Sequence, residues 1–227
     1  ASLAQPDWVR QLLDHGKLDR KRVCRTFSYC TALMRAKDHP LGQYPTGCPP
    51  FDKDAYLPTV TGYYSDTKGN LLSFPFNSST VMFYVNKDAF KKAGLDPEKA
   101  PKTWKEVLAA AEKLKAAGQD CVYTTSWPSW MHIENFSAWH NVPIGTKQNG
   151  MGGVDTQFTI NSPLHVRHIS MLPDMAKKGT FTYAGRTNQG DAKFSSGECA
   201  MFSGSTGAQA GIRKAGKMDW SINFIPY

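Results

Sequence analysis

From Phe51 onward, apolar and polar positions follow two alternating periods, which predicts helices and strands in turn along the chain. Thr103-Trp104-Lys105-Glu106 forms a capping box, and apolar residues then recur at helical spacing until Gly118. Short apolar runs predict strands at 81–85, 121–124, 199–202 and 220–225. This alternation is typical of an α/β fold rather than of a helical bundle or a β-sandwich.

Capping signals predict further helices. Asn86 is expected to cap a short helix that Gly94 closes, and Ser205-Thr206-Gly207 leads into one that ends near Lys214. Ser162-Pro163 begins another helix, and Pro173 should kink it or end it. The residues of that helix that we expect to face inward are Leu164, Ile169 and Leu172.

The remaining segments give weaker signals. We expect a helix around Ile133–Trp139, a glycine-rich loop at Gly145–Gly153, and a short helix capped by Asp191 that runs through Phe194. Residues 1–50 show no sustained period, contain no Glu and hold three of the five cysteines, so we assign them no fold. Our hypothesis is that this segment has a separate origin, such as a frameshift or a gene fusion.

Charge and composition exclude several classes of protein. A hydrophobic content of 41% and an aromatic content of 12% are ordinary for a globular chain, and no apolar run approaches the roughly 20 residues of a membrane span. The net charge is +8, but residues 1–50 contribute half of it, with 8 Lys/Arg against 4 Asp/Glu. The basic cluster at Lys17–Arg22 lacks interleaved aromatic residues, so we predict no nucleic-acid partner. Ala1–Arg10 does not resemble a secretory signal.

No catalytic or metal-binding constellation is evident in the sequence. It contains no Gly-x-Ser-x-Gly elbow, no P-loop and no His-Glu-x-x-His. His165 and His168 share a helix face, and His132 precedes Glu134 by two residues, but ordinary surface or core histidines explain both pairs. We therefore predict a binding protein without a cofactor, a metal or catalytic residues.

Tryptophan and hydroxyl residues give the stronger functional signals. Trp127 and Trp130 flank a proline directly after a predicted strand, where large rings can stack on the C–H faces of a polyol or a sugar. Plain core packing is the alternative. In Phe202–Ala208 a strand ends in Ser and Gly and turns into a helix N-terminus, which suits an anion such as phosphate. A simple helix cap is the alternative there.

Two stretches, Phe74–Gly94 and Pro101–Val107, resemble the extracytoplasmic solute-binding proteins of ABC importers. Within that class of proteins, they resemble most the group that binds sn-glycerol 3-phosphate. The resemblance runs from about Phe51 to Tyr227. It implies a two-lobed α/β fold of the periplasmic-binding type II, with a cleft that closes on ligand by hinge motion. We expect residues 81–216 to form the second lobe, and 51–80 and 217–227 to be fragments of a truncated first lobe. A sheet edge near Trp220–Ile225 would then be exposed.

The resemblance also implies a function and site residues. The expected function is capture of sn-glycerol 3-phosphate, or of glycerophosphodiesters, in the periplasm for a membrane permease and its ATPase. The implied ligand-binding residues are Ser79, Trp127, Trp130 and Ser205, with Ser78 and Ser203 as weaker candidates. Cys121 and Cys199 match cysteine positions of the family and can form a disulfide, or else remain buried thiols.

Other ligand groups of the family lie outside the resembling segment. They are a Tyr and a Glu of the first lobe and, beyond Tyr227, a phosphate-pairing Arg, so we expect this chain alone to bind weakly or not at all. Arg186 and Arg213 could replace that phosphate-pairing Arg only in part, and surface side chains are the alternative for both. Three alternatives remain: an oligosaccharide binder of the same fold, an α/β enzyme, and a remnant of a disrupted transport gene without a function of its own.

Overall fold

The computed structural model describes residues 55–72 and 77–227, so the predicted separate segment 1–50 lies outside the described residues. The chain divides into two compact units, Ala1–Ser78 and Ser79–Tyr227. In the described part of the first unit, α4 (Pro58–Tyr63) is followed by a turn in which Ser65 and Leu71 form an isolated antiparallel bridge.

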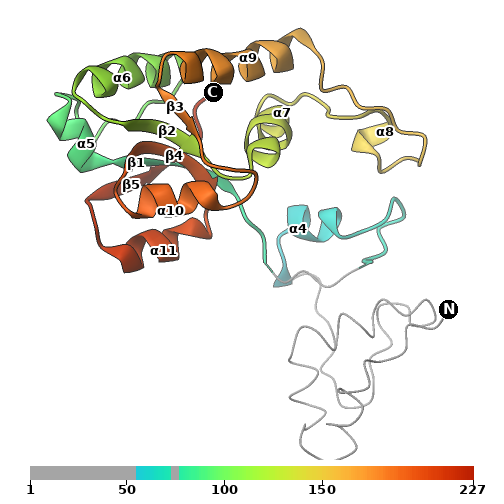
Figure 1. Ribbon diagram of the computed structural model, residues 1–227. Coiled ribbons are helices and arrows are strands. Elements are labelled where there is room, and N and C mark those ends of the chain that lie inside the picture. Colours follow the sequence, from blue (N-terminus) through green and yellow to red (C-terminus); the bar gives the residue numbers. More distant parts are fainter. Residues whose placement is uncertain (1–54, 73–76) are drawn as a thin grey trace, which may run out of the picture. The chain divides into compact units, whose positions relative to one another are not determined.

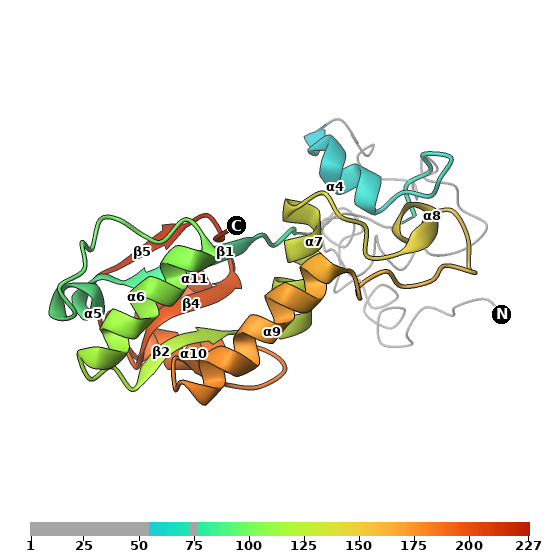
Figure 2. The same ribbon diagram turned by 90° about the horizontal axis from the view of Figure 1, so that it is seen from above.

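The second unit is built around a five-stranded mixed sheet with the strand order β3-β2-β4-β1-β5 (Figures 1 and 2). β2 runs parallel to β3 and β4, whereas β1 runs antiparallel to β4 and β5. In chain order the elements are β1 (Val81–Asn86), α5 (Lys87–Lys92), α6 (Trp104–Ala116), β2 (Cys121–Thr125), the π-helical turn η2 (Trp130–Glu134), α7 (Asn135–Trp139), α8 (Thr146–Asn149), α9 (Pro163–Lys177), β3 (Phe181–Tyr183), α10 (Gln189–Ser195), β4 (Cys199–Ser205), α11 (Ala208–Ala215) and β5 (Trp220–Asn223).

Helices cover both faces of this sheet. Figure 1 shows α6 and α9 on one face, with α10 and α11 on the other. Side chains alternate between the faces along each strand. In β1, Phe83 and Val85 therefore join the core under α5, α6 and α9, while Tyr84 packs with Phe194 and Phe202 under α10 and α11. The predicted α/β layering is thus present in this unit.

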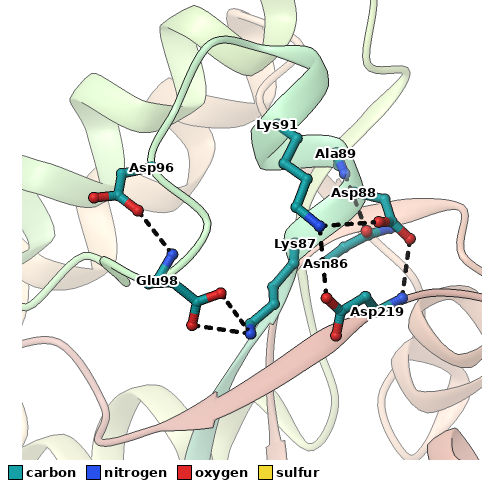
Figure 3. Close-up of polar contacts among 8 residues, drawn as sticks. All are labelled: Asn86, Lys87, Asp88, Ala89, Lys91, Asp96, Glu98 and Asp219. Atoms are coloured by element: carbon teal, nitrogen blue, oxygen red, sulfur yellow. Dashed lines mark hydrogen bonds and ion pairs between the residues drawn. The ribbon is translucent and has the colours of Figure 1, made fainter.

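Two predicted helix caps are confirmed. The Asn86 side chain accepts a hydrogen bond from the Ala89 backbone N–H at 3.1 Å, and α5 ends before Gly94, whose φ is +68° (Figure 3). An Asp88 carboxylate oxygen accepts from the Asp219 N–H at 2.9 Å, which ties α5 to the start of β5. The capping box of Thr103 and Glu106 is complete at the start of α6. Local chemistry alone specifies these helix starts.

The helix after Ser162 differs from its prediction. Ser162 caps α9 as expected, but the buried residues are His165, His168 and Met175, whereas Ile169 is exposed. The helix also continues through Pro173 to Lys177 instead of ending there. Leu172 packs partly buried against the core as predicted, and the two histidines lie on the inward side with it. Similarly, α10 begins after Asn188, and Asp191 lies within its first turn rather than capping it.

The last strand of the described chain joins the sheet of the second unit. β5 pairs with β1 over Phe83↔Asn223 to Asn86↔Trp220, and Ile225 is buried in the core of this unit. The pairing was not predicted, because a short apolar strand does not encode which sheet it joins. The division of 51–227 into lobes stays a prediction.

β2 and β4 are joined covalently where they begin. Cys121 and Cys199 lie opposite each other in the parallel ladder, with Cα atoms 4.5 Å apart, and form a disulfide. Both residues are buried. Of the two alternatives left open by the sequence, the structure has the disulfide.

Candidate functional site

The candidate site lies at one edge of the sheet. The carboxyl ends of β2, β3 and β4 meet there, because Thr125 lies opposite both Tyr183 and Ser203. β1 runs the other way, so its first residue, Val81, reaches the same edge opposite Ser205. Ligands of open α/β sheets bind outside the carboxyl ends of parallel strands. We call this the carboxyl edge.

Hydroxyl residues from two separate segments lie together at the carboxyl edge. The Thr206 N–H donates to the Thr80 carbonyl at 2.9 Å, and the Thr80 N–H donates to Thr206 Oγ1 at 3.3 Å. These bonds hold Ser79 beside the Ser205–Gly207 turn, and the Ser79 side chain is exposed. Ser78, the last residue of the first unit, is exposed as well.

Ser205 combines a fixed backbone with an accessible hydroxyl. Its carbonyl accepts a hydrogen bond from the Tyr84 hydroxyl at 2.8 Å, and its Oγ accepts one from the Gly207 N–H at 3.0 Å. Burial raises the pKa of Tyr84 to about 12, so this phenol remains a donor at neutral pH. No acceptor in the described part of the chain takes the Ser205 hydroxyl proton. The hydroxyl can therefore donate to an anion at the N-terminus of α11.

Trp127 is held in a conformation that is rare for a bulky residue. Its φ is +48°, its side chain is 46% exposed, and its N–H donates to the Thr187 carbonyl at 2.9 Å. Backbone outliers of this kind persist where the surroundings fix them, and they gather at ligand sites. The next turn, η2, is π-helical, a form also enriched at functional sites. Trp130 lies in η2 and is partly buried against the core, so Trp127 is the more accessible of the two rings.

A partly buried polar pair, Ser126 and Asp191, fixes the loop that holds Trp127. Ser126 Oγ donates to the Asp191 carboxylate and accepts from the Asp191 N–H at 3.1 Å. Burial raises the pKa of Asp191, against the opposing effect of this hydrogen bond. A Cβ on Gly190 would lie 2.7 Å from the Thr125 carbonyl oxygen, so only glycine permits this close approach of α10 to β2. The sequence reasoning missed this contact, and the only signal for it was the run Thr187–Asp191.

Ser203 belongs to an interior network rather than to the exposed edge. It is fully buried, and its Oγ accepts from the Tyr123 hydroxyl at 2.9 Å. The Tyr123 hydroxyl oxygen lies 3.1 Å from His132 Nε2, and His132 Nδ1 lies 3.1 Å from His168 Nε2. Because Tyr123 gives its one proton to Ser203, His132 donates from Nε2 and accepts at Nδ1.

Both histidines of this network are neutral at pH 7. Burial lowers the pKa of His132 to about 3, with a further contribution from His168. Burial likewise lowers the pKa of His168 to about 4, with contributions from His140 and His165. His165 is bound separately, by Ser137 and Ser162. Core histidines, the ordinary explanation of this pattern in the sequence, are what the structure contains.

The two arginines considered as partial phosphate partners differ in position. Arg186 is exposed and precedes Thr187, whose carbonyl binds the Trp127 N–H. Arg213 is exposed in the last turn of α11, at the opposite end of that helix from Ser205. Only Arg186 is therefore near the carboxyl edge.

Within residues 55–72 and 77–227, no group of His, Cys, Asp and Glu could hold a metal ion, and no helix is long and apolar enough to cross a membrane.

Comparison with known proteins gives a family match over most of the chain. The sequence profile of the family described as bacterial extracellular solute-binding protein matches residues 41–226. This match begins ten residues before Phe51, where we expected the resemblance to begin.

Curated relatives share about half of their matched residues with this chain. The sn-glycerol-3-phosphate-binding periplasmic protein UgpB of Yersinia pestis bv. Antiqua is 52% identical over 178 residues, which are 78% of this chain and 40% of that protein. The protein of the same name from Escherichia coli K12 is 51% identical over 178 residues and 41% of its length. The chain thus spans about two fifths of the relatives it matches.

Solved structures share the fold at low sequence identity. UgpB from Mycobacterium tuberculosis, in complex with glycerophosphocholine, matches with a TM-score of 0.62 and 22% identity, over 77% of this chain and 44% of that one. Maltose-bound MalE3 of T. maritima matches with a TM-score of 0.58 and 17% identity, over 75% and 44% of the two chains. These matches confirm the predicted α/β fold class of periplasmic binding proteins.

Proposed function

Because the chain belongs to the bacterial extracellular solute-binding protein family, we propose that it supplies part of a binding site for sn-glycerol 3-phosphate. The observation that carries this proposal is the 51–52% identity, over 178 residues, to relatives named for that ligand. A captured solute needs no bond made or broken. We therefore propose that the protein binds its ligand and catalyses nothing.

The accessible groups of the carboxyl edge suit the two ends of this ligand. We assign Trp127 to the C–H face of the glycerol moiety, because its ring is exposed and its backbone is fixed. Ser205 and Ser79 are assigned to polar contacts, with the positive end of the α11 helix dipole favouring the phosphate. Trp130 completes the set as a flanking contact. Ser203, being buried, acts through the position of β4 rather than by direct contact.

Location and partners follow from the same proposal. The relatives are named as periplasmic, and the Cys121–Cys199 disulfide suits an oxidising compartment, so we place the intact protein in the periplasm. There it would deliver its ligand to the permease and ATPase of an ABC importer. Glycerophosphodiesters are a second ligand class of the same site, since a phosphodiester keeps both the anionic group and the glycerol.

The test is a chimera in which residues 51–227 replace the aligned segment of the Escherichia coli relative, so that all ligand groups outside this chain are present. Calorimetric titration with sn-glycerol 3-phosphate should give saturable binding, and maltose should neither bind nor compete. The chain alone should bind the phosphate ester at least tenfold more weakly than the chimera. A chimera that folds but binds maltose, or binds neither compound, would refute the proposal.

An oligosaccharide binder is the second candidate, because maltose-bound MalE3 has the same fold. Tryptophan stacking suits a sugar as well as a glycerol, but the helix N-terminus beside Ser205 favours an anion. Salt distinguishes the two ligands. Binding of a phosphate ester should weaken as ionic strength rises, whereas binding of a neutral sugar should not change.

A further inference from the structure

The Asp191 carboxylate lies beside the segment that presents Trp127. Asp191 belongs to the first turn of α10 and is half-buried. Its carboxylate accepts a hydrogen bond from Ser126 Oγ at 2.5 Å, and Ser126 directly precedes Trp127. A hydroxyl that donates to a carboxylate favours the ionised form of the acid. Asp191 therefore brings a negative charge to this side of the carboxyl edge.

The same charge also reaches the segment that presents Ser205. α10 packs against β4 and α11 (Figure 1), and the Phe194 ring in α10 has its centroid 5.9 Å from that of the Tyr84 ring. The Tyr84 hydroxyl donates to the Ser205 carbonyl at 2.8 Å. Burial, and after it the charge of Asp191, raise the pKa of Tyr84 to about 12. Asp191 is thus an electrostatic neighbour of the turn that leads into α11.

No cation pairs with Asp191 within the described residues. No nitrogen of Lys, Arg or His lies within 4.0 Å of its carboxylate in 55–72 and 77–227. β2 and β4 carry no charged side chains, and the cations of α10 and α11, which are Lys193, Arg213 and Lys214, belong to the last turns of those helices. Arg186 lies on the loop before α10 and is exposed, so water and salt screen its charge. The effect of Asp191 on an anion at this edge is therefore repulsive.

A phosphate ligand carries either one negative charge or two. A phosphomonoester carries mainly two above its second pKa of about 6, whereas a phosphodiester carries one. The N-terminus of α11 attracts both forms. A fixed charge of the same sign repels each ligand charge in turn, so it disfavours a dianion more than a monoanion.

We propose that Asp191 is a specificity-determining residue that sets the charge preference of the carboxyl edge. Its carboxylate disfavours the doubly charged phosphate of a monoester relative to the singly charged phosphate of a diester. This inference rests on the proposed function, since it requires a phosphate group bound beside Ser205. The hydrogen bond between Asp191 and Ser126 is a separate, structural contribution that acts on every ligand alike.

The test compares two probes in the chimera described above, sn-glycerol 3-phosphate and its methyl ester, by calorimetric titration at pH 8. The two probes share the glycerol moiety and differ in the charge of the phosphate. Asp191→Asn should raise the affinity for the monoester, relative to that for the methyl ester, at least threefold. A weakened contact with Ser126 would lower both affinities alike and leave this ratio unchanged. The ratio is also independent of the fraction of protein that is folded, because both probes bind the same fraction.

Two further variants and a second pH isolate the charge of Asp191. Asp191→Glu keeps the charge and should keep the ratio within twofold of that of the unmodified chimera. Asp120→Asn is the matched control, because Asp120 is exposed and directly precedes β2, at the opposite end of that strand. It should change the ratio less than 1.5-fold. At pH 5 both probes carry one charge, so the ratio should be the same in Asp191→Asn and the unmodified chimera.

The possible outcomes separate this inference from the proposed function. An unchanged ratio in Asp191→Asn, an equal change in Asp120→Asn, or a difference that persists at pH 5 would overturn the role of Asp191. In each of these cases both probes still bind, so the proposed function stands. If the folded chimera binds neither probe, the proposed function fails and the charge preference fails with it.

Discussion

The two ends of the β2–β4 strand pair differ in what holds them. At their first residues the strands are joined by the Cys121–Cys199 disulfide within a buried apolar cluster. At the carboxyl edge, hydrogen bonds from loops hold the same strands, and Trp127 is exposed in a strained conformation. We propose that ligand recognition is concentrated at the carboxyl edge, whereas the covalent link stabilises the opposite end of the same strands. Removal of an exposed ring at the carboxyl edge should therefore leave stability largely intact, and removal of the disulfide should leave the exposed groups of that edge in place.

Removal of the disulfide should have the largest effect on stability. Cys121→Ala with Cys199→Ala opens a loop that spans 78 residues, and the unfolded chain regains conformational entropy worth about 4.5 kcal/mol. Urea unfolding followed by tryptophan fluorescence can measure the change, since five of the six tryptophans lie in the second unit. Reductant should destabilise the unmodified chain and have no effect on the variant. A decrease in the free energy of unfolding below about 1 kcal/mol would show that the disulfide is not the main source of stability at the first residues of β2 and β4.

Acid should weaken the interior network next. Folding keeps His132 and His168 neutral, with pKa values of about 3 and about 4, while an unfolded histidine has a pKa of about 6.5. Below pH 6.5 these two histidines bind protons in the unfolded state but stay neutral in the folded state. Their contribution to stability is therefore fully present above that pH and is lost as the pH falls. Between pH 7 and pH 5.5 the titration of His132 and His168 should lower the free energy of unfolding by about 2.5 kcal/mol.

His168→Gln is the variant that tests this assignment. It removes one of the two buried titrating groups and should lower the slope of unfolding free energy against pH by about 1.4 kcal/mol per pH unit. The comparison is made within each protein across pH, so the direct cost of the substitution cancels. An unchanged slope would mean that the buried histidines do not carry the acid sensitivity.

Gly190→Ala tests the packing beneath the carboxyl edge. The added Cβ would lie 2.7 Å from the Thr125 carbonyl and 2.8 Å from Ser126 Oγ, so the backbone must shift, at a cost of about 2 kcal/mol. Gly211→Ala is the matched control, because Gly211 lies inside α11 with nothing within 4 Å of the new Cβ. The control should be neutral or slightly stabilising. Equal effects of the two substitutions in unfolding experiments would disprove this close packing.

Tyr84→Phe should have the smallest effect. It removes the hydrogen bond from the phenol to the Ser205 carbonyl and should cost about 1 kcal/mol. Tyr183→Phe removes an exposed hydroxyl from β3 and should change stability by less than about 0.5 kcal/mol. In the chimera, Tyr84→Phe should also weaken ligand binding modestly, because Ser205 loses one of its anchors. If stability changes and binding does not, Ser205 is not a ligand contact.

Local chemistry determined what could be predicted from the sequence. Caps with their own hydrogen-bond partners gave the starts of α5, α6 and α9, and apolar runs gave four of the five strands. Features set by distant contacts were missed: the inward histidines of α9, the close approach of Gly190 to β2, and the pairing of β5 with β1. β3 was missed too, because its three residues are too short for a periodic signal.

The candidate site divides in the same way. Trp127 and Ser205 are accessible at one edge, as their positions after predicted strands suggested. The burial of Ser203 could not be predicted, because the sequence does not show that the Tyr123 hydroxyl would donate a hydrogen bond to Ser203 Oγ. The positive φ of Trp127 and the π-helical turn after it have no sequence signature either. These features depend on the loop that contains Thr187.

The most direct test measures both properties in the chimera that carries residues 51–227. With Trp127→Ala, the affinity for sn-glycerol 3-phosphate should fall about 30-fold, or about 2 kcal/mol, while the urea midpoint stays unchanged. Phe158→Ala, which removes an aromatic ring that is 81% exposed, against 46% for Trp127, and lies away from the carboxyl-edge residues named above, should change neither. Unchanged affinity in the Trp127 variant, or a parallel loss of affinity and stability, would contradict the account that ligand recognition lies at the carboxyl edge.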